Sequence, residues 1–482
     1  MQHQFGGTRL FLTGMLLGNF IALFVISSAL NARAGPPMGD DGVVGPMRGL
    51  YVWLGQRGAP TTPIPNDHYA RFMWSDLEST RGHYNFARID AELQRLPPGG
   101  SFSFRVMALN SFYDRNGGVG IPTYVVSACP KGFDVPIASL IGRGPTKVHV
   151  PDWNCPVFLE RVIALLTALG ERYDRNPRIG YVDIGIYGNW GEWHLTGIPP
   201  GIDPYTRPDI DTTGAVPGTA ATREAIVDAH VRAFPHTQLL MMTDDKVSLV
   251  HAMKLATAVP IGLRRDSFGS DHFDRNLLAG IVDGAERRLV EERWKTAPFV
   301  VECMAGIANR DPTWSTMQEQ VARWHLSAIG NGGFGPGGSG DWVATSPAQK
   351  EAFLSAARTS GYHLAITDAR KTGTTDRDHV AVAVTWVNEG VAPTYLPWLV
   401  EYRLCGSAGC GEQTSGGLKL ASVLPRKAGA AAIDRVTLRL PPGGGEGGLE
   451  IRIKDARRAD RILRLDGLET RPDGFQSVGA LH

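Results

Sequence analysis

Between residues 48 and 360, short apolar runs alternate with longer amphipathic stretches, and this alternation is the strongest constraint on the fold. The apolar runs are rich in Val, Ile, Leu and Phe, as expected for parallel strands buried on both faces. They are Leu50–Leu54, Arg71–Trp74, Phe102–Leu109, Ile179–Tyr187, Gln238–Met242, Val259–Leu263, Phe299–Cys303 and His325–Ile329. Helix-like segments such as Val157–Arg172 and Thr222–Ala233 separate them. Eight strand–helix units in about 310 residues predict a (β/α)8 TIM barrel, which we place at residues 45–360.

A doubly wound open sheet is the alternative α/β fold. It usually needs fewer strands, and no Gly-x-Gly-x-x-Gly segment follows the first apolar run. The barrel is therefore the preferred prediction.

Residues 361–482 have a different pattern. Their apolar and polar residues alternate as in strands, and turns rich in Gly and Pro, such as Pro441–Gly448, separate the runs. The runs are His379–Val387, Trp398–Leu404, Asp434–Leu440 and Leu449–Lys454. This pattern predicts a C-terminal antiparallel β-sandwich, which we expect to shield the barrel rather than to bind a ligand.

The N-terminus has the features of a targeting segment. Arg9 precedes an uncharged stretch from Leu10 to Leu30, and Ala32-Arg33-Ala34 places small residues at both cleavage-determining positions. We expect residues 1–34 to be a secretory signal peptide; a retained anchor is the alternative, because the apolar stretch is nearly long enough to span a bilayer. Either way the remaining chain is expected to be secreted, periplasmic or extracellular.

The five cysteines are compatible with an oxidising compartment. Cys405 and Cys410 flank a Gly-Ser-Ala-Gly turn, and Cys129 and Cys155 flank one loop-rich segment, so each pair is a candidate disulfide. Cys303 lies inside an apolar run and is expected to be a buried thiol.

Charge and motifs exclude several classes of function. The chain has 49 Lys and Arg against 48 Asp and Glu, a net charge of +1, so no global field favours nucleic acid or an anionic membrane. A membrane contact is expected only through the N-terminal segment, if it is uncleaved. Neither a CxxC pair nor an HExxH segment occurs, so we predict no metal and no cofactor.

Charged and aromatic residues concentrate where the predicted barrel strands end. Active sites of this fold lie at the C-terminal ends of the strands, and aromatic rings there suit stacking on sugars. The binding candidates at these positions are Trp74, Glu78, Arg105, Asn189, Trp190, Trp193, His194, Asp244, Arg265, Asp266 and Trp342. The alternatives remain open: the tryptophans can be ordinary core, and the aspartates can be helix caps.

Two glutamates stand out as catalytic candidates. Glu192 follows the fourth strand between two tryptophans, and Glu302 ends the seventh strand after three apolar residues. Strands four and seven lie on opposite parts of the barrel rim, so the two carboxyl groups can face each other as in a retaining glycosidase. Partial burial beside Trp190 and Trp193 would help an acid keep its proton. The alternatives are a structural carboxylate at Glu192 and an ion pair of Glu302 with Arg105 or Arg265.

These positions resemble the clan of retaining glycoside hydrolases with catalytic glutamates on strands four and seven. The segment Trp74-Ser75-Asp76-Leu77-Glu78, followed by Gly82, Tyr84 and Phe86, is similar to a W-x-x-x-E-x-x-x-G-x-Y-x-F motif after strand two in family 42-type β-galactosidases. The whole layout resembles a bacterial family of unknown function with a barrel, a C-terminal sandwich and a G-x-W-G-E-W motif, here Gly188 to Trp193.

The resemblance implies that Glu192 is the acid/base and Glu302 the nucleophile. The chain departs from the clan at one position: the residue before the acid/base is usually Asn, and here it is Gly191. Three functions follow as hypotheses. The first is an exported hydrolase that cleaves an oligo- or polysaccharide. The second is a non-catalytic carbohydrate-binding barrel of the cell envelope, and the third is an envelope protein whose sandwich is the working part.

Overall fold

The computed structural model describes residues 46–54, 67–113, 115–136, 147–195, 217–303, 315–333, 345–443 and 447–482. The predicted signal peptide, residues 1–34, and Trp342 lie outside this part of the chain. Among the described helices, none is long and apolar enough to cross a bilayer.

Eight parallel strands close into a barrel, as the alternating pattern predicted. Each strand pairs in parallel with its neighbour, and β2 pairs with both β1 and β5, which closes the ring. A further strand, β9 (Ile186–Asn189), follows β8 after Gly185 and pairs with β5. The barrel strands are β1 (Gly49–Trp53), β2 (Asp67–Met73), β5 (Ser101–Leu109), β8 (Ile179–Ile184), β10 (Leu239–Met242), β11 (Gly262–Phe268), β12 (Phe299–Cys303) and β13 (Ala328–Gly330).

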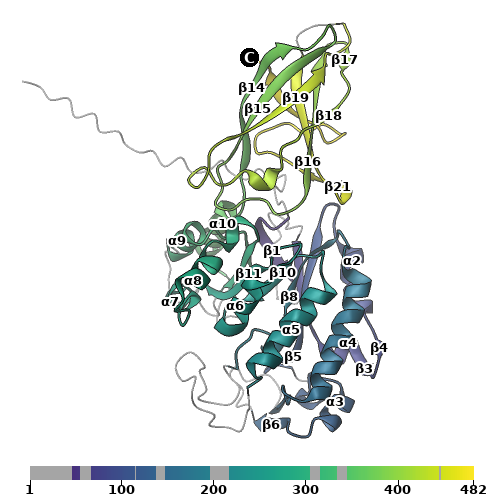
Figure 1. Ribbon diagram of the computed structural model, residues 1–482, viewed down its shortest axis with the longest axis vertical. Helices are drawn as coiled ribbons and strands as arrows, with labels where there is room; N and C mark the ends of the chain where they lie inside the picture. Colours follow the sequence, from purple (N-terminus) through teal and green to yellow (C-terminus); the bar gives the residue numbers. More distant parts are fainter. Residues whose placement is uncertain are drawn as a thin grey trace, which may run out of the picture. The chain divides into compact units, whose positions relative to one another are not determined.

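Helices follow the strands from β2 onward, and α4 and α5 lie side by side on the outside of the barrel (Figure 1). They are α1 (Trp74–Leu77), α2 (Ala87–Arg95), α3 (Thr123–Ala128), α4 (Pro156–Tyr173), α5 (Ala220–Ala233), α6 (Lys246–Lys254), α7 (Asp271–Leu277), α8 (Gly284–Glu291), α9 (Ser315–Arg323) and α10 (Pro347–Thr359). Short antiparallel pairs, β3 (Glu78–Thr80) with β4 (His83–Tyr84) and β6 (Phe133–Pro136) with β7 (Lys147–Val150), lie in the connections.

The inside of the barrel has its own apolar layer. It consists of Tyr51, Tyr69, Tyr181, Leu240, Val300 and Ala328, one residue from each of six strands, with Met47. Since side chains alternate along a strand, the residues two positions further point inward as well, one layer closer to the C-terminal ends. On β1, β2, β8 and β12 these are Trp53, Arg71, Asp183 and Glu302. A layer of ionisable residues therefore lies directly on top of the apolar one.

The C-terminal residues form two antiparallel sheets with one shared core, which confirms the predicted sandwich. Trp386 on one sheet donates its indole N–H to the Tyr402 hydroxyl on the other at 3.0 Å. One sheet contains β14 (Leu364–Thr374), β15 (His379–Asn388) and β19 (Ala432–Arg439). The other contains β16 (Trp398–Gly406), β17 (Gly409–Cys410), β18 (Thr414–Ser415), β20 (Gly448–Asp455), β21 (Arg458–Leu463) and β22 (Gln476–Ala480).

Both candidate disulfides are present. Cys129 is bonded to Cys155, and Cys405 is bonded to Cys410 across the β16–β17 hairpin. Cys303 is a free, buried thiol, as predicted.

The largest differences from the predicted strand boundaries occur at two positions. Strand β2 starts at Asp67 and not at Arg71, and β11 runs to Phe268 and not only to Leu263. In both cases charged residues continue the strand, because Asp67, Arg264 and Arg265 are buried with hydrogen-bond partners inside the fold.

Candidate functional site

The segment that follows β8 has an unusual backbone. Three residues other than glycine, Ile186, Trp190 and Trp193, have φ between 55° and 69°, a region that L side chains rarely adopt. Each costs about 1–3 kcal/mol and persists only when its surroundings fix it. Gly188, with φ of 84°, is required here, because a Cβ would lie 2.7 Å from the backbone N and O of His194.

Several hydrogen bonds hold this segment in place. The Asn189 amide N–H donates to the His194 carbonyl at 2.7 Å, and the Trp193 indole donates to the Ile184 carbonyl at 2.6 Å. The side chain of Asn189 accepts from the Ser111 amide at 3.0 Å and donates to its hydroxyl at 3.1 Å. Asn189 and Trp193 therefore shape the loop, and their buried side chains anchor the residue between them, Glu192, at the C-terminal end of the barrel.

One guanidinium bridges the two predicted catalytic glutamates. Nη1 of Arg71 lies 2.5 Å from Oε1 of Glu192, and Nη2 lies 2.8 Å from Oε2 of Glu302. Oxygens bound to the two terminal nitrogens of one guanidinium lie within about 8 Å of each other. The guanidinium itself lies 4.3 Å from the centre of the Trp53 ring and donates through Nε to the Tyr69 hydroxyl at 3.2 Å.

Arg105 connects Glu192 to the inside of the barrel. Its Nη2 lies 2.9 Å from Oδ2 of Asp183, and its Nη1 lies 3.3 Å from Oε1 of Glu192. The Tyr69 hydroxyl donates to the same Asp183 oxygen at 2.7 Å. Gly185 leaves room for this arginine, because a Cβ there would lie 2.7 Å from its Cγ.

Arg264 and Asp266 hold Glu302 from the other side. Nη2 of Arg264 lies 2.5 Å from Oε2 of Glu302, and Nε of Arg264 lies 3.1 Å from Oδ1 of Asp266. Asp266 also lies 3.6 Å from Arg71. Together these residues form one buried network, here called the rim cluster: Arg71, Arg105, Asp183, Glu192, Arg264, Asp266 and Glu302.

The rim cluster holds three guanidinium groups and four carboxyl groups, so its negative charges outnumber its positive ones when every carboxyl group is ionised. Burial and then the charge of Asp266 raise the pKa of Glu302 to about 7, despite the opposing effect of Arg71 and Arg264. Burial would also raise the pKa of Asp266, but Arg264 and Arg71 outweigh it and lower that pKa. Glu302 is therefore the carboxyl group that takes up a proton near neutral pH.

His194 extends the rim cluster. Its Nε2 lies 3.1 Å from Oε2 of Glu192, the oxygen that does not face Arg71. Burial alone would lower the pKa of His194, but the hydrogen bond and charge of Glu192 outweigh it and raise that pKa. The pair can hold a proton beside Glu192.

The structure thus brings together Glu192, Glu302, Arg105, Asp266 and His194 among the predicted site residues. The main-chain carbonyl of Trp190 faces the same cluster, 3.3 Å from Nη1 of Arg105. Asp244 lies near His194 and Arg265, 3.9 Å from the latter.

Three other predicted residues lie elsewhere. Arg265 points away from the barrel interior and donates to the Phe273 and His272 carbonyls and to the Thr243 hydroxyl. Trp74 and Glu78 are fully buried beside α4. Glu78 accepts from the Trp74 indole, the Gly82 amide, the Tyr124 hydroxyl and Arg161, each at 2.8 Å. The Trp-x-x-x-Glu-x-x-x-Gly motif therefore ties together the β2–α2 connection and does not reach the rim cluster.

Sequence reasoning missed Arg71, Asp183 and Arg264 as site residues. The signal that points to them is the two-residue period: Arg71 is in phase with Tyr69, and Asp183 with Tyr181. Similarly, Arg264 shares the inward face with Asp266, whereas Arg265 between them faces outward.

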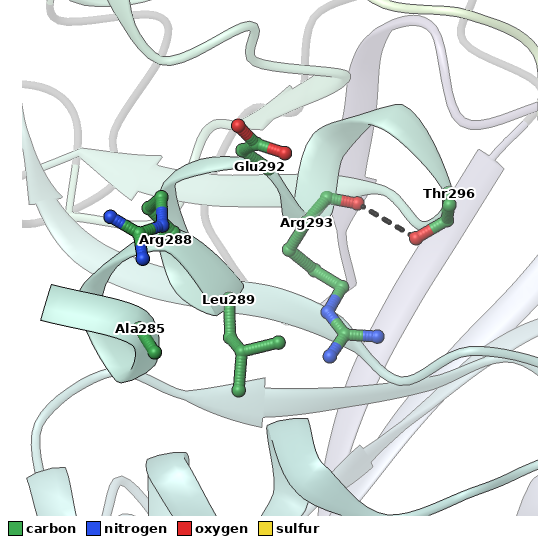
Figure 2. A pocket seen from close by; sticks show the side chains of 6 residues that line it. All are labelled: Ala285, Arg288, Leu289, Glu292, Arg293 and Thr296. Atoms are coloured by element: carbon green, nitrogen blue, oxygen red, sulfur yellow. Dashed lines mark hydrogen bonds between the residues drawn. The ribbon is translucent and has the colours of Figure 1, made fainter.

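A surface pocket of about 370 Å³ lies on the helical outside of the barrel (Figure 2). It is lined by Ala285, Arg288, Leu289, Glu292, Arg293 and Thr296, from α8 and the turn that follows it. This pocket contains no residue of the rim cluster, and its lining residues precede the N-terminal end of β12 in the chain.

The chain matches no known sequence family and no curated protein. Among solved structures, it is similar to endo-glycoceramidase II from Rhodococcus sp. in complex with a cellobiose-like imidazole, at 12% identity and a TM-score of 0.34, over 82% of this chain and 97% of that one. It is also similar to the endoglucanase Cel5A from Pseudomonas stutzeri, at 16% identity and a TM-score of 0.31, over 60% and 80%. A third is GH5_18 from Streptomyces cattleya in complex with GlcNAc, at 13% identity and a TM-score of 0.34, over 61% and 71%. At such identities and TM-scores these likenesses do not assign a reaction to this chain.

Proposed function

We propose that the protein is an exported glycoside hydrolase that cleaves glycosidic bonds in an oligo- or polysaccharide, with Glu192 and Glu302 as its catalytic pair. The observation that carries the proposal is the bridge through Arg71, which keeps the two carboxyl groups within about 8 Å at the C-terminal end of the barrel. Retaining cleavage requires carboxyl groups roughly 5–5.5 Å apart and inverting cleavage roughly 6.5–9.5 Å, and an upper limit of about 8 Å is compatible with both.

The roles follow from the resemblance to the retaining clan. They require an ionised Glu302, so turnover should rise as the pH passes the value of about 7 to which its pKa is raised. Glu302 attacks the anomeric carbon, while Glu192 gives its proton to the leaving oxygen and later takes one from water, which releases the sugar from Glu302. His194, at 3.1 Å from Glu192, supplies and receives that proton. Arg105 positions Glu192 by direct contact, and Asp266 positions Glu302 through Arg71 and Arg264.

Export is part of the same proposal. Two disulfides fit an oxidising compartment, and the composition of residues 1–34 fits a signal peptide. The substrate class that agrees with both export and glycoside cleavage is a carbohydrate outside the cytoplasm.

A second candidate is a non-catalytic carbohydrate-binding barrel. The observation that favours it is the position of Arg71, whose guanidinium occupies space between Glu192 and Glu302. A hydrolase must place the anomeric carbon against Glu302, and the Oε2 atom of this residue is already in contact with Arg71 and Arg264. Attack through Oε2 would require Arg71 or Arg264 to give up its contact when substrate binds, whereas attack through Oε1 would not.

A screen with aryl glycosides of different sugars tests both candidates. We expect the wild type to hydrolyse at least one of them, and Glu302→Gln and Glu192→Gln each to lower its turnover by at least about 100-fold. Glu319→Gln, an exposed glutamate on α9, is the matched control and should keep full turnover. Equal turnover by Glu302→Gln and the wild type would remove Glu302 as nucleophile. Oligosaccharide binding without any turnover would reject the hydrolase in favour of the second candidate.

A further inference from the structure

We infer that Phe112, stacked on Trp190, is a binding platform for a pyranose ring at the same end of the barrel as the Glu192–Glu302 pair, an inference that rests on the proposed carbohydrate function. Phe112 lies in the loop that follows β5, at the C-terminal end of the barrel. Its side chain is 43% exposed. The large apolar residues that are exposed in the described part of the chain are Phe112, Val247, Val282, Leu289, Leu399 and Ile433, and Phe112 is the aromatic one.

The platform is built on a fixed base. The rings of Phe112 and Trp190 are stacked, with centroids 5.5 Å apart and an interplanar angle of 20°. Trp190 packs against the buried side chains of Met73, Met107 and Tyr113. Main-chain hydrogen bonds fix both residues: the Trp190 amide donates to the Leu109 carbonyl at 2.9 Å, and the Phe112 amide to the Asn110 side chain at 2.8 Å. A rigid aromatic surface loses little entropy when a ligand stacks on it.

The platform is linked to Glu192 by a series of contacts through Trp190 and His194. The ring of Trp190 lies 5.7 Å from that of His194, and His194 binds Glu192 at 3.1 Å. A sugar stacked on the face of Phe112 that Trp190 leaves open is therefore separated from Glu192 by Trp190 and His194, as a sugar in a subsite some residues from the cleaved bond would be. This position distinguishes Phe112 from Leu399 and Ile433, which lie on sandwich strands, and from Val282 and Leu289, which lie at helix α8. Val247, in the first turn of α6, is aliphatic.

The surroundings favour a sugar over a protein. A stable protein interface needs roughly 1,000 Å² or more, whereas one exposed ring matches the size of one sugar residue. Polar groups belong to the same loop. The Asn110 side chain accepts from the Phe112 amide at 2.8 Å, and the Tyr113 hydroxyl donates at 3.0 Å to Asp76, which lies 3.7 Å from the exposed Arg115. An apolar face with a polar edge suits a pyranose, whose C–H groups meet the ring while its hydroxyls bind at the rim.

The ligand class is a neutral oligosaccharide of β-linked pyranoses with equatorial hydroxyl groups. In such a sugar both faces carry C–H groups and the hydroxyls point outward, so an aromatic ring can cover a face without burying an oxygen. An axial hydroxyl blocks one of the two faces, so such a sugar could stack on Phe112 only through the other face.

Calorimetric titration with cellohexaose, xylohexaose and mannohexaose tests the inference on the full chain. We expect cellohexaose or xylohexaose to bind more tightly than mannohexaose, whose 2-hydroxyls are axial. Phe112→Ala should weaken binding roughly three- to tenfold, and Phe112→Trp should retain it. Leu399→Ala, at a side chain 42% exposed on the sandwich, is the matched control and should bind as the wild type does.

The outcomes separate the platform from the proposed function. Equal binding by Phe112→Ala and the wild type would overturn the platform and leave the carbohydrate function intact. Preferential binding of mannohexaose would overturn the ligand class. Failure of the wild type to bind any of the three sugars would count against the platform and the proposed function together. Thermal melting of each variant shows whether a change in binding reflects a change in folding.

Discussion

The ionisation of Glu302 gives the sharpest test of the electrostatics of the site, because two opposing effects act on one carboxyl group. Burial and the neighbouring Asp266 favour the protonated form, while Arg71 and Arg264 favour the ionised form. The first pair of effects prevails and raises the pKa of Glu302 from 4.5 to about 7. Glu302→Gln replaces the carboxyl by a neutral group of the same shape, so it mimics the protonated state at every pH.

The size of the effect follows from linkage. Each unit of pKa difference between the folded and unfolded states corresponds to about 1.4 kcal/mol, so a rise from 4.5 to about 7 amounts to about 3 kcal/mol. Since the folded-state pKa is the higher one, this stability is present below pH 4.5 and is lost as the pH rises through about 7. The free energy of unfolding of the wild type should therefore fall relative to that of Glu302→Gln by about 3 kcal/mol between pH 4.5 and pH 8.

Urea denaturation followed by tryptophan fluorescence, at several pH values from 4.5 to 8, measures this difference. Glu319→Gln, with its exposed side chain, should show a pH dependence like that of the wild type. If the free energy of unfolding of Glu302→Gln instead falls below that of the wild type at pH 8, the two guanidinium groups dominate and the pKa of Glu302 is not raised.

Three further predictions concern the framework of the site. Glu78→Gln should lower the free energy of unfolding by about 3–5 kcal/mol, because it removes the charge that pairs with buried Arg161, yet sugar binding by the folded variant should be unchanged; urea denaturation and calorimetry measure the two effects. Gly188→Ala should destabilise the chain by about 2 kcal/mol or more and abolish turnover, since its φ of 84° and the backbone 2.7 Å from the new Cβ both oppose the side chain; circular dichroism and aryl glycoside assays report on these. Cys129→Ser opens a disulfide between residues 26 positions apart and should cost about 3 kcal/mol, seen as a lower melting temperature under non-reducing conditions.

The barrel and the sandwich could be predicted from the sequence because burial determines how apolar and polar residues follow one another along each strand. Parallel strands covered on both faces appear as continuous apolar runs, such as Leu239–Met242, and sandwich strands as alternating ones, such as His379–Asn388. The strand limits were less predictable where charged residues continue a strand into the barrel, as Arg264 does in β11. Such residues look like loop residues until their partners on other strands are known.

The site was predictable in part for a related reason. Glu192 and Glu302 stand out because each follows or ends a strand and adds a charge next to apolar neighbours. Arg71 does not stand out in this way, and only the closed sheet brings it between the two glutamates, 121 and 231 residues away along the chain. Choosing between Arg264 and Arg265 requires the phase of the strand, which a single sequence does not fix near a strand end.

The motif after strand two illustrates the opposite case. Trp74 and Glu78 match a pattern that was predicted to bind substrate, but the indole and the carboxylate bind each other at 2.8 Å beneath α4. A short motif indicates that its residues have a role, but only the tertiary structure shows whether they bind a ligand or each other.

Covalent trapping of the sugar on the enzyme is the direct test of whether Glu302 acts as a nucleophile opposite Glu192. A 2-deoxy-2-fluoro aryl glycoside of the best substrate should label the wild type stoichiometrically, and peptide mass spectrometry should place the sugar on Glu302. Glu302→Gln should remain unlabelled, whereas Glu192→Gln should still be labelled when the leaving group is activated enough to depart without an acid. A label on another residue, or hydrolysis that proceeds unchanged in Glu302→Gln, would show that Glu302 is not the nucleophile.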